Sequence, residues 1–553
     1  MRQLSKKFAA QTTLAGLCLA ASAVYKDRPA FSLYSDGKIC KNVTYERMGA
    51  LSGQIGSVLR QLGIQKGGRV LLLAENCPQW PIAYFGIAFA GAVSVPLLTG
   101  FSVEQIEYIC NHSGVSAICL SRSMAGKFDS IAHLPLFSKL PFIYIDGIAE
   151  NSHAGGISVS VNNIEKQINI NSFNNFIDDS SPDDLATIIY TSGTQGSSKG
   201  VMLSSRNIIS SSLSSLKMVN LLPKDRMLSV LPLAHSYECG LGLVAPVISG
   251  ASITYLDKPP SPSVLLPAIQ LLKPTAMLSV PLLIEKIYKN SIFPKLRANK
   301  LYRFPLTRRL AIWFAGRKLL TAFGGKLRFF GIGGAPLSPE VEKFLYYAKF
   351  PYSIGYGLTE ASPLVAGNSP LRFKLKSGIS SADKVMLRIS KGAVNTESDE
   401  GEIQLLGPNV MMGYYNDIEK TEEVFTSDGW LRTGDLGNFD NKGRLHIRGR
   451  LKALILGPSG ENIYPEEIEG ILGSSALVEE SLVYSGKKGE LVALVRLSEA
   501  AKTAAGVIEQ TMEDLRTWVN KKLSAFSKLS RIEIKYEPFE KTPTMKIKRY
   551  LYV

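Results

Sequence analysis

Short apolar runs alternate with helical stretches in the first quarter of the chain. The predicted elements, in order, are the strand Val70–Leu73, the helix Trp80–Ala90, the strand Val93–Leu97, the helix Val103–Cys110 and the strand Ala117–Leu120. This alternation is typical of βαβ units whose parallel sheet is covered on both faces. It returns over residues 201–340, so the sequence predicts an α/β fold. At 553 residues the chain exceeds one compact core, and two or more domains are expected.

A loop rich in glycine and hydroxyl side chains follows the apolar run Leu185–Ile189, which we expect to be a buried strand. Residues 190–200 read Tyr-Thr-Ser-Gly-Thr-Gln-Gly-Ser-Ser-Lys-Gly. Glycine lets the backbone approach an anion closely, and a concave set of N–H donors suits a phosphate. The loop is not a Walker A motif, because Lys199 lies between Ser198 and Gly200. The alternative is a flexible surface loop.

Two later stretches favour the phosphate-binding interpretation. Residues 355–360 read Gly-Tyr-Gly-Leu-Thr-Glu, and 433–450 contain Thr-Gly-Asp and then Arg-Gly-Arg. In order and spacing these motifs resemble the adenylate-forming superfamily of acyl-CoA synthetases, peptide-synthetase adenylation domains and luciferases. The chain is most similar to the long-chain fatty acid–CoA ligases, from about residue 15 to its end.

The resemblance implies a two-domain α/β architecture. Residues 1–450 would form a large N-terminal domain of parallel and mixed sheets packed with helices. Residues 451–553 would form a small, mobile α+β C-terminal domain, with Lys452 at the hinge. Within this second part, a helical pattern from Ile508 to Leu523 precedes an alternating strand, Arg531–Glu537.

The resemblance also implies a reaction. A fatty acid, expected to be long-chain, would be activated by ATP through acyl-AMP and passed to CoA, releasing AMP and pyrophosphate. Two anions must meet in the first step, so the site must gather positive charge and oriented donors. Mg²⁺ is the expected cofactor, with ATP and CoA as co-substrates. No covalent protein nucleophile is needed, which fits the absence of a Ser-His-Asp or Cys-His signature.

Nucleotide binding is assigned by resemblance to five parts of the chain. The residues are Thr191, Ser192, Gly193, Thr194, Gln195, Gly196, Lys199, Gly333, Gly334, Ala335, Pro336, Tyr356, Gly357, Thr359, Asp435, Arg450 and Lys546. The 191–199 loop would hold the β- and γ-phosphates, while Gly333–Pro336 and Tyr356 would line the adenine pocket. Asp435 would accept both ribose hydroxyls, with Arg450 as its companion.

Catalytic roles are assigned in the same way. Glu360 would bind Mg²⁺ with Thr191 as a second contact, and Thr359 would donate to the α-phosphate. Lys546 would reach the α-phosphate and the carboxylate during adenylation. His235, in Leu-Pro-Leu-Ala-His-Ser-Tyr, would lie at the mouth of the acyl pocket.

The chain departs from the family pattern at three positions. Gln195 replaces a usual threonine, Ser198 a proline, and Met545 the glycine before the lysine. Methionine resists backbone angles that glycine adopts, so Lys548 is an alternative to Lys546. These departures also leave open a catalytically silent acyl- or nucleotide-binding protein. An acyl carrier protein as acceptor is a further alternative to CoA.

Two apolar segments imitate membrane signals. Leu14–Ala23 ends in Ala-Ser-Ala, as a signal peptide does, but the resemblance makes it a first helix that leads into a strand at Pro29–Tyr34. Ile82–Thr99 is uncharged and long enough to span a bilayer, but glycines and Pro96 interrupt it. We expect a buried helix and then a buried strand there.

The net charge of +16, from 63 basic and 47 acidic residues, favours anionic partners. The stretch 286–328 is strongly basic through Lys286, Lys289, Lys295, Arg297, Lys300, Arg303, Arg308, Arg309, Arg317, Lys318, Lys326 and Arg328. Residues 307–320 suggest a basic amphipathic helix that lies on an anionic membrane; a solvated surface helix is the alternative. We therefore expect a cytoplasmic protein with peripheral membrane association.

Other classes are disfavoured by the sequence. Nothing resembles a nucleic-acid-binding module. The six cysteines and five histidines are scattered without a CxxC pair, so a structural zinc site is not expected. Free, buried thiols in a reducing compartment are the expected state of the cysteines.

Overall fold

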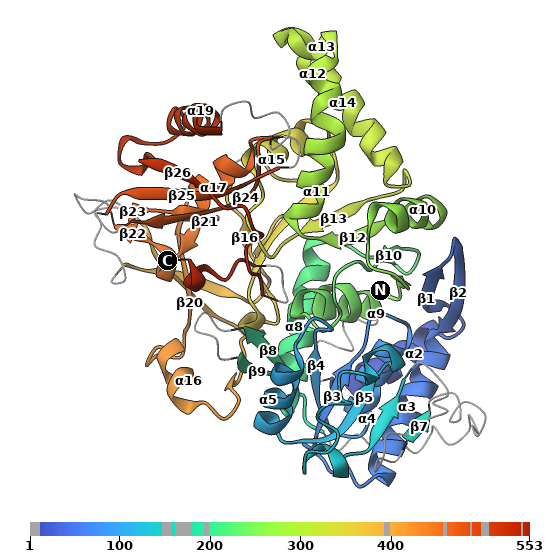
Figure 1. Ribbon diagram of the computed structural model, residues 1–553. Coiled ribbons are helices and arrows are strands. Elements are labelled where there is room, and N and C mark those ends of the chain that lie inside the picture. Colours follow the sequence, from blue (N-terminus) through green and yellow to red (C-terminus); the bar gives the residue numbers. More distant parts are fainter. Residues whose placement is uncertain are drawn as a thin grey trace.

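The computed structural model describes residues 12–145, 158–160, 180–192, 198–375, 377–391, 399–456, 462–486, 489–498, 501, 508–542 and 546–552. Two large sheets and a smaller antiparallel sheet form the bulk of the molecule, and a small α+β unit follows at the C-terminal end (Figure 1). The α/β class and the division into a large and a small unit are confirmed.

The first large sheet has eight strands. In spatial order they are β19 (Gly413–Tyr414), β9 (Ser198–Ser204), β8 (Leu185–Ser192), β4 (Val93–Leu97), β3 (Arg69–Leu73), β5 (Val115–Leu120), β6 (Phe142–Tyr144) and β7 (Ser158–Ser160). The strands from β8 to β7 are parallel, and β9 and β19 extend one edge in antiparallel fashion. The helices α4 (Gln79–Phe89) and α5 (Val103–Ser113) connect them as predicted.

Local sequence explains the limits of these helices. The Ser102 hydroxyl accepts the Gln105 N–H, and the Gln105 side chain accepts the Ser102 N–H, so a capping box begins α5. Gly114, with φ of 61°, ends the helix in the left-handed conformation. Helix α4 is buried almost all round, which is why its sequence lacks a polar face.

The second large sheet has nine strands. In spatial order they are β16 (Ser380–Ser381), β15 (Leu364–Gly367), β14 (Tyr352–Gly357), β13 (Phe329–Ile332), β12 (Ala276–Ser279), β10 (Arg226–Leu228), β11 (Ser252–Leu256), β1 (Pro29–Ser35) and β2 (Lys38–Thr44). The strands from β14 to β1 are parallel, and both edges are antiparallel.

Helices between and around the two sheets give them a shared core. Helix α8 (Ser205–Met218) contacts β8 and β9 of the first sheet and β15 of the second. Other helices of this part are α2 (Leu14–Tyr25), α3 (Tyr45–Gln61), α6 (Arg122–Ala125), the π-helix η3 (Glu238–Val244), α9 (Ala245–Ser249), α10 (Pro262–Leu272), α15 (Pro339–Tyr347) and α16 (Ile418–Val424). The first helix and the strand after it are thus where the sequence places them.

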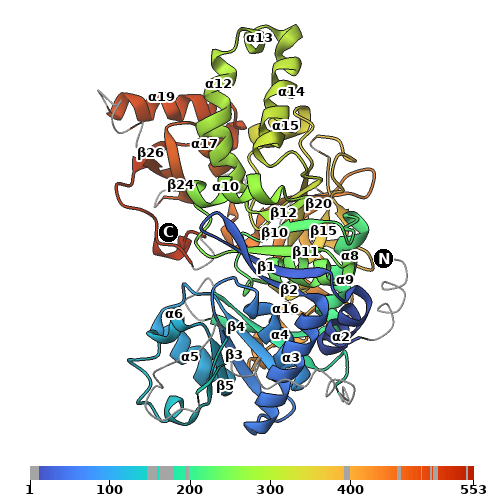
Figure 2. The ribbon, with the colours of Figure 1, turned by 90° about the vertical axis from the view of Figure 1, so that its right-hand side faces the viewer.

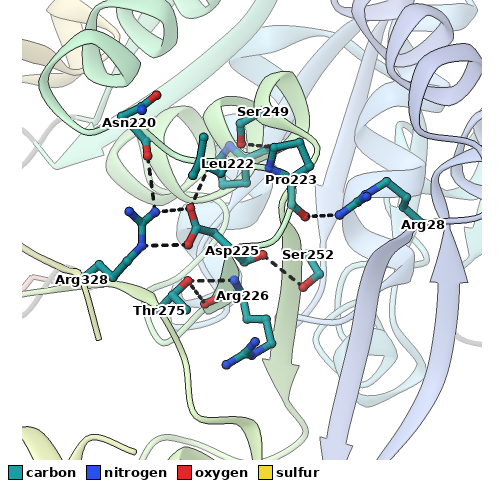
Figure 3. Close-up of polar contacts among 11 residues, drawn as sticks. Arg28, Asn220, Leu222, Pro223, Asp225, Arg226, Ser249, Ser252, Thr275 and Arg328 are labelled. Carbon is teal, nitrogen blue, oxygen red and sulfur yellow. Dashed lines mark hydrogen bonds and ion pairs between the residues drawn. The ribbon is translucent and has the colours of Figure 1, made fainter. Parts of the chain in front are cut away.

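The parallel strands of the second sheet are fixed at their starting end by a buried carboxylate (Figure 3). Asp225, only 2% exposed, accepts from the Leu222 N–H at 2.7 Å and from Arg328 Nε at 3.1 Å. The neighbouring Pro223 carbonyl accepts from the Arg28 guanidinium at 2.6 Å. Asp225 therefore ties the entry to β10 to the chain just before β13.

A four-stranded antiparallel sheet completes the large unit. It consists of β17 (Met386–Ser390), β18 (Gly401–Leu406), β20 (Leu431–Phe439) and β21 (Leu445–Arg450), in that order. The small unit then contains β22 (Ile455–Leu456), β23 (Asn462–Ile463), α17 (Pro465–Gly473), β24 (Val478–Ser485), β25 (Leu491–Leu497), α19 (Ile508–Asn520) and β26 (Arg531–Ile534). It has an apolar cluster of its own, drawn from residues 463–529. The last strand is shorter than the sequence predicts.

The basic stretch forms a helical projection (Figures 1 and 2). It runs through α11 (Pro281–Ile287), η4 (Tyr288–Ile292), α12 (Phe293–Ala298), α13 (Lys300–Arg303) and α14 (Pro305–Ala322). The helix predicted over 307–320 is present, but the prediction that it is amphipathic is wrong. It buries Ala311, Ile312, Gly316 and Leu319, while Leu310, Trp313 and Phe314 are exposed among the basic residues. Apolar side chains therefore lie on both sides of α14.

The apolar segment Ile82–Thr99 and the six cysteines all lie in parts of the chain that the structure describes. Ile82–Thr99 forms most of α4 and then β4, as predicted. Among the helices that the structure describes, none is long and apolar enough to cross a membrane. All six cysteines are free; Cys18, Cys110, Cys119 and Cys239 are buried, and Cys40 and Cys77 are half-buried.

Candidate functional site

The predicted site residues follow two adjacent parallel strands of the second sheet. Gly333–Pro336 come directly after β13, and Thr359 and Glu360 follow β14 in the short 3₁₀ helix η5 (Thr359–Ala361). Parallel strands end at the same edge of a sheet, where α/β proteins hold their ligands. Both segments therefore reach one edge of the sheet, together with Tyr356 near the end of β14.

A buried carboxylate joins this edge to the four-stranded sheet. Asp435 on β20 is 5% exposed and accepts from Tyr356 Oη at 2.7 Å. Its second oxygen lies 2.9 Å from Nε of Arg450, its direct cross-strand partner on β21. Burial and the adjacent carboxylate raise the pKa of Tyr356 well above its usual value, and Asp435 raises that of Arg450. The tyrosine stays a neutral donor, and the arginine stays charged.

Glu360 is held from two directions. Its carboxylate accepts from Tyr414 Oη at 2.9 Å, and its carbonyl accepts from the Met411 N–H at 2.9 Å. Tyr414 in turn lies under Lys199, whose Nζ is 4.7 Å from the ring centre. Burial and the Glu360 carboxylate raise the pKa of Tyr414. These two contacts connect the second sheet, through Glu360 and Tyr414, to Lys199 on the first sheet.

The predicted phosphate loop begins and ends as an antiparallel pair. β8 ends at Ser192 and β9 starts at Ser198, with Thr191 opposite Lys199. Gly193, Thr194, Gln195 and Gly196 lie outside the described residues. β19 pairs with β9 through Tyr414 and Val201. The stems of the loop are therefore attached to the segment that carries Tyr414.

Packing and backbone conformation favour glycine in the other two motifs. A Cβ on Gly357 would lie 2.0 Å from the carbonyl oxygen of Pro363. A Cβ on Gly333 would lie 3.2 Å from the ring of Tyr237, and Gly334 has a φ of +86°. Ala335 and Pro336 complete the turn after β13 and are exposed. The turn is therefore open to solvent on one side and covered by Tyr237 on the other.

His235 lies in the segment that covers this edge. Its Nδ1 accepts from the Tyr237 N–H at 3.2 Å, and the next residue, Ser236, places its hydroxyl 3.3 Å from that of Thr359. Burial, with a smaller contribution from the charge of Lys546, lowers the pKa of His235 to about 4. The imidazole is therefore neutral near pH 7.

Lys546 reaches the site from the far end of the chain. Its ammonium interacts electrostatically with Arg450, Asp435 and Glu360, as well as with His235. Burial and then Arg450 lower its pKa, and the two carboxylates oppose that change. Lys548 instead lies 3.3 Å from Glu540, and Arg549 pairs with Glu469. The structure therefore brings Lys546, not its basic neighbours, to the predicted site.

Lys452 lies in the 3₁₀ helix η7 (Leu451–Ala453), directly after β21. This short segment connects the four-stranded sheet to the small unit. Across the two units, Lys289 Nζ donates to the carbonyl of Gly473 at the end of α17. The role of Lys452 as a hinge remains a prediction.

Mg²⁺ would find one carboxylate here rather than a protein cage. Within the described parts of the chain, no group of three or more His, Cys, Asp or Glu is arranged to hold a metal. Mg²⁺ is commonly bound by one or two carboxylates together with substrate phosphates. Glu360, beside the stems of the predicted phosphate loop, fits that mode of binding.

Sequence reasoning missed four residues of this region. They are Ser236, which contacts Thr359; Tyr237, which covers Gly333; Glu238, which is fully buried; and Tyr414, which holds Glu360. Ser236 and Tyr237 belong to the motif quoted around His235, and Glu238 follows it directly, but the local sequence gives no sign of what these side chains contact. Tyr414 gave no signal, because its importance comes from a pairing between distant segments.

Comparisons with known proteins agree with this geometry. A family model described as "AMP-binding enzyme" matches residues 19–415. Long chain acyl-CoA synthetase 6, peroxisomal, of Arabidopsis thaliana is 30% identical over 92% of this chain and 79% of its own length. 4-Coumarate–CoA ligase 3 of rice is 25% identical over 97% of this chain and 91% of its own.

A solved structure shows the same fold. The Bacillus subtilis o-succinylbenzoate coenzyme A synthetase, in complex with ATP and magnesium ion, has a TM-score of 0.74 and 23% identity. The match covers 97% of this chain and 98% of that one, so it includes both units.

Proposed function

Because the chain belongs to the AMP-binding enzyme family, we propose that it is an adenylate-forming ligase that converts a long-chain fatty acid to its CoA thioester. The similarity to long chain acyl-CoA synthetase 6 supports the choice of acid. A 4-coumarate–CoA ligase also matches almost the whole chain, so similarity supports the ligase class more strongly than the chain length.

One observation carries the proposal. Lys546, from the end of the chain, lies within electrostatic range of Glu360, Asp435 and Arg450, which come from three other segments. A cation near a carboxylate that can bind a metal, and near the Asp435–Arg450 ion pair, is the arrangement that adenylation requires, since charge develops on the α-phosphate. A surface of unrelated function would not need these four side chains together.

In the first step, an oxygen of the fatty acid carboxylate attacks the α-phosphorus of ATP. The bond from that phosphorus to the bridging oxygen breaks, and pyrophosphate leaves with the electron pair. We assign stabilisation of the α-phosphate to the Lys546 ammonium and the Thr359 hydroxyl. Tyr356 and the turn at Gly333–Pro336 would border the adenine, and Asp435 would accept from the ribose.

Mg²⁺ would be held by Glu360, with Thr191 as the second contact. When bound, it supplies charge neutralisation for the phosphate oxygens of ATP and pyrophosphate. Tyr414 positions the Glu360 carboxylate through its hydroxyl. Lys199, beside the Tyr414 ring, would add positive charge near the β- and γ-phosphates.

In the second step, the sulfur of CoA attacks the acyl carbonyl carbon, AMP leaves, and the thiol proton passes to solvent. Lys546 would have to withdraw so that CoA can approach. We propose that the small unit, residues 451–553, turns about Lys452 between the steps. The neutral His235 would border the acyl group without exchanging a proton.

The experiment is a substrate screen with the purified chain, ATP and CoA. Fatty acids of graded length are compared with 4-coumarate, and pyrophosphate and thioester are both measured. Highest kcat/KM for long acids supports the proposal, and highest kcat/KM for 4-coumarate rejects the choice of acid. Pyrophosphate without thioester directs the search to a carrier-protein thiol. No pyrophosphate with any acid would mean a silent binding protein.

A further inference from the structure

The helical projection exposes several large apolar side chains to solvent. At the connection from α13 to α14, Phe304 is 65% exposed and Leu306 98% exposed. On α14, Leu310, Trp313 and Phe314 are 41–50% exposed. The projection extends beyond the rest of the molecule, so its tip can approach a flat surface (Figures 1 and 2). Clustered apolar side chains of this kind mark an interaction surface.

The sequence of the projection carries charge of one sign only. The sequence from 286 to 328 contains no aspartate or glutamate. The basic side chains of α12–α14 are exposed; they are Lys295, Arg297, Lys300, Arg303, Arg308, Arg309, Arg317 and Lys318. A partner for this surface must therefore be anionic and must also accept apolar groups.

Three of the arginines line a shallow depression that is open to solvent. It has a volume of about 630 Å³ and is lined by Arg297, Ala298, Tyr302, Arg303 and Arg308. Arg308 is oriented by its Nε, which donates to the Tyr302 carbonyl at 3.0 Å, and by the Tyr302 ring. The planar guanidinium group matches phosphate oxygens in geometry, so the depression suits a phosphodiester.

We propose that α12–α14 is a docking surface for an anionic phospholipid bilayer. The arginine-lined depression takes a lipid phosphate, and Phe304 and Leu306 enter the acyl region beside it. An anionic lipid bilayer supplies both negative charge and an apolar phase, whereas free phosphate supplies negative charge alone. This proposal does not depend on the catalytic one, because binding requires neither ATP nor CoA.

The test measures vesicle binding by the full chain without substrates. Vesicles of phosphatidylcholine are compared with vesicles that also contain phosphatidylglycerol, at low salt and at about 0.1 M salt, where the screening length is about 10 Å. We expect binding only to the anionic vesicles, weakened by salt. Each basic side chain near such a surface contributes roughly a fivefold factor in affinity. The combined Arg297→Gln, Arg303→Gln and Arg308→Gln variant should therefore bind about a hundredfold more weakly.

A charge-matched control separates position from net charge. Lys38→Gln, Lys139→Gln and Lys224→Gln remove the same charge from exposed positions outside the projection, and this variant should bind nearly as the parent does. Leu306→Ser tests the apolar part; since Leu306 is 98% exposed, the change leaves the folded core intact. We expect about a tenfold loss of affinity with the salt dependence retained.

Several results would overturn the proposal. They are equal binding to neutral vesicles, binding to neither kind, and equal losses in the two charge variants. Binding of inorganic phosphate without binding of anionic vesicles would also reject it in favour of a small-anion site. Melting temperatures of the variants equal to that of the parent would show that lost binding is not lost folding.

Discussion

Replacement of Lys546 by alanine should slow the first half-reaction strongly and spare the second. The ammonium lies among Arg450, Asp435 and Glu360, where burial and Arg450 already lower its pKa. An α-phosphate bound there would give the ammonium an anionic partner. Loss of one such oriented donor typically slows a reaction about 10²–10³-fold, which is about 3–4 kcal/mol of transition-state stabilisation. If the small unit turns before thioester formation, the second step loses nothing.

The assay measures the two half-reactions separately. Pyrophosphate release from ATP and fatty acid reports the first, and thioester formation from supplied acyl-AMP and CoA reports the second. Lys548→Ala is the matched control, because Lys548 pairs with Glu540. An exposed pair contributes only about 0–1 kcal/mol, so both rates should stay near those of the parent. Normal pyrophosphate release by Lys546→Ala would refute the assignment, as would equal losses in both half-reactions.

Three further changes test the site and the fold. Glu360→Gln should nearly eliminate pyrophosphate release at unchanged melting temperature, and a parent-like rate would reject the magnesium role. Asp225→Ala leaves Arg328 and the Leu222 N–H without their buried acceptor. It should therefore lower the free energy of unfolding, measured by urea titration, by about 2–3 kcal/mol. An unchanged free energy of unfolding would contradict this role of Asp225. Burial raises the pKa of Glu238 from 4.5 to about 8, so the unfolded chain loses this proton first. Stability of the parent should fall as pH rises between those values, and Glu238→Gln should remove that part of the fall in the urea midpoint.

Much of the fold could be predicted from local pattern. The alternation over 69–120 gave the right elements because parallel strands buried on both faces are continuously apolar. The order of strands in the two large sheets could not be predicted in this way. β1 lies beside β11 and β8 beside β4, and such pairings depend on contacts between distant segments.

The site was predictable where a motif carries it. Tyr356, Asp435 and Arg450 meet as the resemblance implies, and Lys546 joins them from the chain end. The partner of Glu360 was not predictable, because Tyr414 reaches it only through the pairing of β19 with β9. The error on α14 has a related cause. The spacing of residues along the sequence predicts a helix, but which of its side chains are buried depends on the helices that it packs against.

The packing around Gly357 bears on how relatives of this chain should be sorted into active and inactive proteins. A side chain at this position would collide with the Pro363 carbonyl, so packing alone favours glycine there in any protein that keeps this local structure. A lineage that lost catalysis would still carry this part of its most recognisable motif. Retention of Gly357 therefore does not by itself identify an active enzyme. Lys546 reaches the site from the chain end and supports no element of the large unit, so selection on activity is what would preserve it.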